Sequence, residues 1–159
     1  MNIKEYLKKL GVEFREFKHK PVFTVEEAKK ERTCENLRGV HSKNLFLKER
    51  KSRRFYLVVT PESKPLEIKK LEGVLGDKLK FANDGDLKEI LGVTPGSVSP
   101  FGLINDKSRK AKVIIDREIW ESEFVSFHPN VNTETLELPR EGFHKYIGSL
   151  KNEISVLDL

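Results

Sequence analysis

The apolar residues of this chain come in short runs of strand length, and this pattern most constrains the fold. Two such runs, at 44–49 ("NLFLKE") and 54–60 ("RFYLVVT"), are separated only by the basic turn "RKSR". So short a connection predicts an antiparallel strand pair. Alternating or continuous apolar runs predict further strands at 12–19, 78–83, 101–106, 112–116, 123–129 and 134–139. We expect 101–106 and 112–116 to form a second strand pair around "KSRKA".

Helical periodicity recurs at intervals between these strands. Apolar spacing predicts helices at 3–11, 66–76, 86–92 and 140–150, and another at 24–32 opens with a capping box of Thr24 and Glu27. The helices do not alternate strictly with strands, which disfavours a purely parallel sheet. We therefore expect one α+β domain over residues 1–159, with a mixed, mainly antiparallel sheet and helices packed around it.

Several classes of protein and site are disfavoured by what the sequence lacks. No apolar run approaches the ~20 residues of a membrane helix, and the N-terminal segment has no apolar core of a secretory signal. Cys34 is the only cysteine, and the four histidines are scattered, so a cysteine-cluster zinc site or a disulfide is not expected. Neither phosphate-binding nor dinucleotide-binding glycine motifs occur. We expect a cytoplasmic protein without metal or cofactor.

The positive charge is concentrated in one segment. Lysine and arginine outnumber acidic residues by 30 to 25, and residues 43–54 alone carry six basic residues against one acidic residue. Clustered Lys and Arg favour a polyanionic partner such as a nucleic acid. The alternative is a solvated turn whose charges protect a strand edge.

The backbone of the stretch "TPGSVSP" at 94–100 is restricted by two prolines. Pro95-Gly96 suits the centre of a type II turn, and Pro100 fixes the exit. We expect the amides of residues 96–99 to point into one concavity, as in an anion-binding nest or an oxyanion hole. A plain turn is the alternative.

Two polar positions stand out on the predicted strands. Lys43 shares a face with Leu45 and Leu47, where its ammonium group either meets an anion or extends to solvent. His128 ends a strand, and it is either a site residue or a histidine satisfied in the core.

Four ordered motifs together resemble the YbaK-like aminoacyl-tRNA deacylases. They are "HKPVFTVEEA", "HSKNLFLKE", "LGVTPGSVSPFGLIND" and "FHPNVNTET", and the likeness runs from about Tyr6 to the C-terminus. Within that family the chain is most similar to the free-standing ProXp-ala type, a relative of the editing domain of prolyl-tRNA synthetase. The resemblance implies metal-free hydrolysis of alanine mischarged onto tRNA(Pro).

The resemblance also implies roles for particular residues. Catalytic roles fall to Lys43, which would hold the terminal phosphate, and to Asn44, Gly96, Ser97 and His128. Walls of a small apolar pocket that admits alanine and refuses proline would come from Phe23, Val25, Ala28, Val98, Ser99, Pro100 and Phe101. Contacts to the acceptor stem of tRNA(Pro) would come from Lys48, Arg50, Lys51, Arg53, Arg54, Lys78 and Lys80.

No side-chain nucleophile is implied, so the vicinal ribose hydroxyl is a hypothetical activator of water. Normal hydrolysis of a tRNA ending in 2′-deoxyadenosine would contradict that step. Two alternatives stay open: a deacylase for cysteine on the same tRNA, and a tRNA-binding regulatory module without turnover. Prolyl-tRNA synthetase is a possible protein partner.

Overall fold

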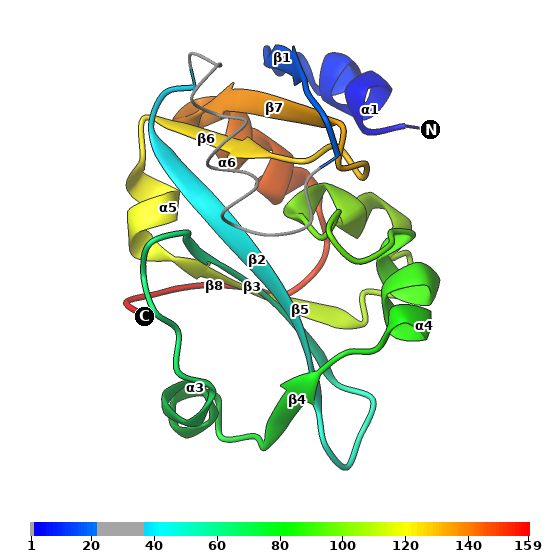
Figure 1. Ribbon diagram of the computed structural model, residues 1–159, viewed down its shortest axis with the longest axis vertical. Helices are drawn as coiled ribbons and strands as arrows, with labels where there is room; N and C mark the ends of the chain where they lie inside the picture. The colour runs from blue at the N-terminus through cyan, green and yellow to red at the C-terminus, as the bar shows by residue number, and fades with distance from the viewer. Residues whose placement is uncertain (1, 22–36) are drawn as a thin grey trace.

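The computed structural model describes residues 2–21 and 37–159 (Figure 1). The helix predicted at 24–32, the expected pocket residues Phe23, Val25 and Ala28, and Cys34 lie outside the described residues. An eight-stranded sheet runs through the middle of the molecule, in the order β1-β7-β6-β2-β3-β5-β8, with β4 added beside β2. The strands are β1 (Arg15–Lys18), β2 (Val40–Glu49), β3 (Phe55–Pro61), β4 (Leu79–Phe81), β5 (Ala111–Asp116), β6 (Phe124–Phe127), β7 (Glu134–Pro139) and β8 (Ile154–Leu157).

The predicted α+β class is confirmed, but the sheet is mixed rather than mainly antiparallel. Among the described strands, β1–β7, β6–β7, β2–β3 and β2–β4 pair antiparallel. The pairs β2–β6, β3–β5 and β5–β8 are parallel. Long connections that contain helices join the parallel strands, which the short turns noted in the sequence did not reveal.

Both faces of the sheet are buried at its centre. Along β3, Leu57 and Val59 contribute to one apolar cluster, whereas Tyr56 and Val58 contribute to another on the opposite face. The helices α1 (Ile3–Leu10) and α6 (Arg140–Ser149) supply side chains to the first cluster, and α3 (Ile68–Leu75) supplies Leu71 to the second. A strand buried on both faces reads as a continuous apolar run, as "FYLVV" does.

The prediction of a strand at 101–106 is wrong. Residues Pro100–Asn105 form a 3-10 helix, η2, because Ser99 caps its start by accepting from the Phe101 amide and Pro100 occupies the first turn. Gly102 lies against Leu91, and a Cβ at this glycine would be only 3.0 Å from the Leu91 Cβ. The expected partner strand β5 pairs in parallel with β3 and β8 instead.

Two short elements were not predicted, and one helix differs from its prediction. The helix α5 (Arg117–Glu121) and the strand β8 follow β5 and α6. The helix expected at 86–92 begins earlier as α4 (Asp84–Asp86), under a capping box of Asn83 and Asp86, and continues as the π-helical turn η1 (Leu87–Leu91). Among the described helices, none is long and apolar enough to cross a membrane.

Candidate functional site

A small polar cavity lies where β2 meets the end of β6. Its volume is about 40 Å³, and parallel pairing of His41 with Ser126 brings its walls together. Its lining residues are His41, Ser42, Asn44, Ser126, Phe127, His128 and Thr135. All of them except Phe127 are polar, so the cavity suits a small polar group rather than an apolar side chain alone. The structure thus brings together Asn44 and His128, which are 84 positions apart in the sequence.

The imidazole of His128 is oriented by the backbone. Its Nδ1 lies 2.9 Å from the carbonyl oxygen of Glu134. A carbonyl oxygen only accepts, so Nδ1 is the donor in this hydrogen bond. The position of the ring is therefore set by the start of β7.

A second histidine, His19, binds one of the residues that line the cavity. His19 donates from Nδ1 to the Lys20 carbonyl oxygen at 2.8 Å, and its Nε2 lies 2.8 Å from the Thr135 hydroxyl. Its ring centre lies 5.6 Å from that of His128. His19 therefore fixes the orientation of the Thr135 side chain, which lines the cavity.

The amide oxygen of Asn44 is an unsatisfied acceptor. Its Oδ1 is buried, and it has no hydrogen-bond partner within the part of the chain that the structure describes. Leaving such a group unpaired costs about 1–3 kcal/mol. A buried polar atom without a partner calls for an explanation, and a bound water or ligand at this position would supply one.

Among the described residues, no strand pairs with the middle of β2 on the side away from β3, next to the cavity, and we call this stretch the open edge of β2. On the side away from β3, β2 pairs with β6 at residues 40–41 and with β4 at residues 47–49. In an antiparallel pair, every second residue directs its main-chain N–H and C=O away from the partner strand. Phe46 is such a residue, because its carbonyl oxygen accepts from the Ala82 amide on the side away from β3. Asn44, two positions earlier, therefore directs its main-chain groups to the same side. Between these two pairings, no described strand covers residues 42–46.

Lys43 is the neighbour of Asn44 on β2, but its side chain lies on the opposite face of the sheet. Side chains alternate along a strand, so Lys43 points to the opposite face from Asn44 and is not among the residues that line the cavity. It is half-buried and forms no ion pair or hydrogen bond with the described residues. A half-buried ammonium group without a counter-ion is well suited to bind an anion.

The loop at 94–100 forms the predicted turn. Gly96 has φ +90°, and the Ser97 amide donates to the Thr94 carbonyl oxygen at 3.1 Å, as a type II turn requires. We expected all four amides of residues 96–99 to point into one concavity, but the Ser97 amide is used within the turn. The amides of Gly96, Val98 and Ser99 have no acceptor among the described residues, so three of the four predicted donors are available.

The loop is tied to His128 and to the core. Ser99 donates from Oγ to the His128 carbonyl oxygen at 2.8 Å. Tyr146 donates to the Pro100 carbonyl oxygen at 2.7 Å, and burial raises the pKa of this tyrosine well above its usual range, so the donor proton stays in place. Phe101 is fully buried between aromatic rings of the core, and Val98 is half-buried. None of the predicted loop residues, Gly96 to Phe101, lines the cavity.

The basic residues predicted to contact tRNA gather at the far end of β2. Lys48 pairs with Lys80 across β2 and β4, and the Arg50 amide donates to the Lys78 carbonyl oxygen. Only Arg53 and Arg54 of this set pair with acidic residues within the described part of the chain, with Glu89 and Asp77. Lys51 at the turn is exposed. We refer to residues 48–54, 78 and 80 as the basic end.

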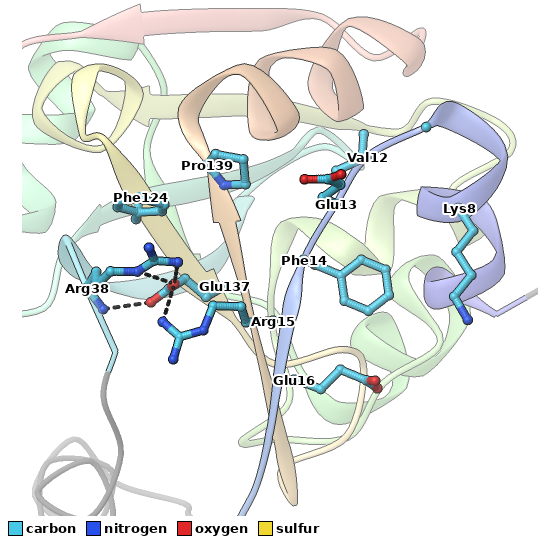
Figure 2. Close-up of a pocket in the computed structure, with 11 residues that line it drawn as sticks. Lys8, Val12, Glu13, Phe14, Arg15, Glu16, Arg38, Phe124, Glu137 and Pro139 are labelled. Carbon is cyan, nitrogen blue, oxygen red and sulfur yellow. Dashed lines mark hydrogen bonds and ion pairs between the residues drawn. The ribbon is translucent and has the colours of Figure 1, made fainter.

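A larger hollow, in which the charges cancel, lies beside the cavity, because its lining residue Glu137 pairs directly with Ser126 of the cavity across β6 and β7. It has a volume of about 880 Å³ and lies between α1, β1 and β7 (Figure 2). Its buried carboxylate, Glu137, is bound by Arg38 through the backbone amide at 2.6 Å and through two guanidinium nitrogens at 2.8 and 2.6 Å, with Arg15 at 3.1 Å. None of the residues predicted from the sequence lines this hollow, so we assign the site to the smaller cavity.

Several residues of the cavity were not predicted from the sequence. Ser42 and Ser126 each precede a predicted site residue by two positions, so strand periodicity offered a signal for both. The hydrogen bond between His19 and Thr135 joins β1 to β7 over 116 positions, and no local pattern indicates it.

Comparison with known proteins identifies the family. Residues 19–146 match the model of the aminoacyl-tRNA editing domain. The chain is 34% identical to the prolyl-tRNA editing protein ProX of Acetoanaerobium sticklandii, over 96% of this chain and 93% of that protein. It is 36% identical to prolyl-tRNA synthetase associated domain-containing protein 1 of Danio rerio, over 84% of this chain and 73% of that protein.

Solved structures share the fold. One, of a candidate trans-editing enzyme for prolyl-tRNA synthetase, superposes with a TM-score of 0.72 at 18% identity and covers 99% of this chain and 93% of its own. Another, the hypothetical protein APE2540, has a TM-score of 0.72 at 21% identity and covers 96% and 95% of the two chains. With motifs, family model and relatives in agreement, the chain belongs to the aminoacyl-tRNA editing domain family, the YbaK-like aminoacyl-tRNA deacylases.

Proposed function

We propose that this deacylase removes alanine mischarged onto tRNA(Pro). The relatives named as prolyl-tRNA editing and prolyl-tRNA synthetase associated proteins support tRNA(Pro) as the substrate RNA. The observation that carries the choice of amino acid is the cavity of about 40 Å³ beside an open strand edge. This volume exceeds that needed for a single water by only a few-fold, so it suits a methyl group and not a pyrrolidine ring.

The open edge of β2 suggests how the terminal nucleotide binds. In the proposed complex the acyl group enters the cavity on the Asn44 face, and the terminal phosphate reaches Lys43 on the opposite face. The main-chain groups of Asn44 lie between these two positions and offer one donor and one acceptor to the nucleotide. One strand therefore positions both the ester and its phosphate, which serves the orientation that hydrolysis needs.

The proposed reaction needs no side-chain nucleophile. A water attacks the ester carbonyl carbon, the bond from that carbon to the ribose oxygen breaks, and alanine and the free ribose hydroxyl are released. The amides of Gly96, Val98 and Ser99 stabilise the oxyanion that develops on the carbonyl oxygen. His128, held by the Glu134 carbonyl oxygen, orients the water or the terminal nucleotide, and the vicinal ribose hydroxyl helps to activate the water.

The cavity differs from the small apolar pocket expected from the sequence. Among its described lining residues, Phe127 alone is apolar and can contact a methyl group, whereas the acceptor atom of Asn44 suits the α-amino group. Exclusion of proline by size can be steep, but a difference between alanine and cysteine is worth only about 1–3 kcal/mol in such a pocket. Cysteine on the same tRNA therefore remains the alternative substrate.

Other parts of the functional assignment stay predictions. A role in translation fidelity predicts a cytoplasmic protein, and prolyl-tRNA synthetase stays a predicted partner. A tRNA-binding module without turnover stays the second alternative, and hydrolysis of the charged tRNA distinguishes it from a deacylase.

Filling the cavity tests the proposed function. Ser126→Thr adds one methyl group to a wall that is 6% exposed, and it should lower kcat for Ala-tRNA(Pro) by about 10-fold or more, because the acyl group is displaced. Single-turnover release of alanine measures this effect. The same substitution at Ser155 on β8, far from the cavity, is the matched control. Equal rates for wild type and Ser126→Thr would exclude the cavity as the acyl site.

A further inference from the structure

Two segments that carry predicted site residues are joined by a reciprocal pair of hydrogen bonds. Ser99 donates from Oγ to the His128 carbonyl oxygen at 2.8 Å, and Asn130 donates from Nδ2 to the Phe101 carbonyl oxygen at 3.3 Å. Each segment therefore supplies one side-chain donor and one main-chain acceptor. We refer to Ser99, Phe101, His128 and Asn130 as the clamp.

The hydroxyl group of Ser99 is fully engaged within the clamp. The residue is 0% exposed and does not line the cavity. Besides donating to His128, its Oγ accepts from the Phe101 amide at 3.1 Å, so both the proton and a lone pair of the hydroxyl are used. These contacts favour a positioning role for Ser99 over direct contact with the substrate.

Asn130 holds the clamp from the other segment. Its φ of +64° lies in the left-handed region, which asparagine adopts more readily than most other residues with a side chain. Its backbone amide donates to the His128 carbonyl oxygen at 2.9 Å, so this oxygen accepts from both segments. The bond to Phe101 is the one hydrogen bond that the Asn130 side chain makes within the described residues, since its Oδ1 is buried without a partner.

Aromatic packing surrounds the clamp. The ring of Phe101 lies edge-on to the ring of Phe127, the residue before His128, with the ring centres 5.5 Å apart. Tyr146 packs edge-on against Phe101 at 5.5 Å and donates to the carbonyl oxygen of Pro100. Aromatic pairs in this geometry stabilise a core beyond the burial of their surface. The end of the loop and the main chain of His128 therefore form one packed unit.

We propose that Ser99 and Asn130 are positioning residues that fix the amides of the 94–100 loop relative to the His128 imidazole. His128 lines the cavity and the loop does not, so the clamp links the proposed oxyanion donors to the cavity through hydrogen bonds. The inference rests on the proposed function for the roles of the loop and the imidazole. Both groups must be aligned on one ester, and a displacement of about 1 Å can cost about 100-fold in rate.

Single-turnover hydrolysis of Ala-tRNA(Pro) at several enzyme concentrations tests the clamp. We expect kcat to fall by about 10- to 100-fold for Ser99→Ala and by about 10-fold for Asn130→Gly, with KM changed by less than about threefold, because alignment is lost while the contacts to phosphate and acyl group remain. Glycine adopts the left-handed backbone without strain, so Asn130→Gly removes only the side chain and its bond to Phe101.

Ser149→Ala on α6 is the matched control. The Ser149 hydroxyl also donates to a main-chain carbonyl oxygen, that of Tyr146 at 2.6 Å, and accepts from Tyr6 at 2.7 Å. This variant should leave kcat unchanged. Thermal unfolding is measured for every variant, and an equal fall of kcat in Ser149→Ala at a similar loss of stability would overturn the proposal.

A cycle with His128→Ala shows whether the effect passes through the imidazole. In that background, Ser99→Ala should lower the remaining rate by no more than about threefold, because the group that the clamp positions is already absent. The full loss of rate in the His128→Ala background would overturn the proposal. So would wild-type rates for both Ser99→Ala and Asn130→Gly.

A spectroscopic measurement separates the clamp from the proposed function. In NMR spectra of the free enzyme, the ring signals of His128 should shift or broaden in Ser99→Ala and Asn130→Gly but not in Ser149→Ala. No tRNA is needed, so a wild-type enzyme that releases no alanine would contradict the proposed function and leave the clamp measurable. Unchanged ring signals and rates in both clamp variants, beside normal alanine release by the wild type, would overturn only the clamp.

Discussion

Lys43→Ala is expected to lower kcat/KM for Ala-tRNA(Pro) by about 100-fold or more. The substitution removes the ammonium group proposed to hold the terminal phosphate, and truncating one partner of a charged pair commonly costs about 2–5 kcal/mol. The terminal nucleotide would also lose its alignment over the cavity, which by itself can cost about 100-fold. Single-turnover hydrolysis at several enzyme concentrations separates the loss of binding from the loss of rate.

Two further variants give this prediction its controls. Lys43→Arg keeps the charge but presents a planar fork in place of a point charge, so it should recover only part of the activity. Lys112→Ala removes another half-buried strand lysine, one that pairs with exposed Glu153, and should leave hydrolysis unchanged. A fully active Lys43→Ala enzyme would show that the phosphate anchor lies elsewhere.

Gly39→Ala is expected to cost about 3 kcal/mol or more of folding stability. Gly39 has φ +73°, and a Cβ at this position would lie 2.1 Å from the Phe124 carbonyl oxygen. Both the left-handed backbone and the clash with the main chain of β6 oppose any side chain there. In a chain of this length, the loss corresponds to a fall of about 10 °C in Tm.

The same substitution should also impair hydrolysis, because Gly39 immediately precedes the β2–β6 pairing that forms the cavity. Gly73→Ala is the matched control. Gly73 lies within α3, a Cβ there would meet nothing within 4 Å, and the change should be neutral or stabilising by up to about 1 kcal/mol. If Gly39→Ala unfolds at the wild-type temperature, the close approach of these strands is not as described.

Much of the local structure followed from the sequence, because local chemistry decides it. The turn at Pro95-Gly96 is specified by the two residues that suit its φ values, and the hairpin between β2 and β3 by the short basic connection. The segment 101–106 shows the limit of such patterns. Its apolar residues suggested a strand, but the cap at Ser99 and close contact with Leu91 favour a 3-10 helix.

The site itself depends on pairings between distant segments. Lys43, Asn44 and His128 were predicted through family motifs, yet the approach of His128 to Asn44 depends on the pairing of β2 with β6. The open edge of β2 arises because β6 and β4 pair with the same side of β2 at different positions along the strand, at residues 40–41 and 47–49. Likewise, the bond from Ser99 to the His128 carbonyl oxygen joins two motifs that no short-range pattern connects.

The central claim is that a small cavity on β2 admits alanine and excludes proline. The most direct measurement is single-turnover hydrolysis of tRNA(Pro) charged with alanine, cysteine or proline, using one preparation of the wild-type enzyme. We predict rapid release of alanine, no more than slow release of proline, and no faster release of cysteine than of alanine. A preference for cysteine would keep the cavity and assign the other substrate. Removal of proline at a rate comparable to alanine, or tRNA binding without hydrolysis of any ester, would contradict the account.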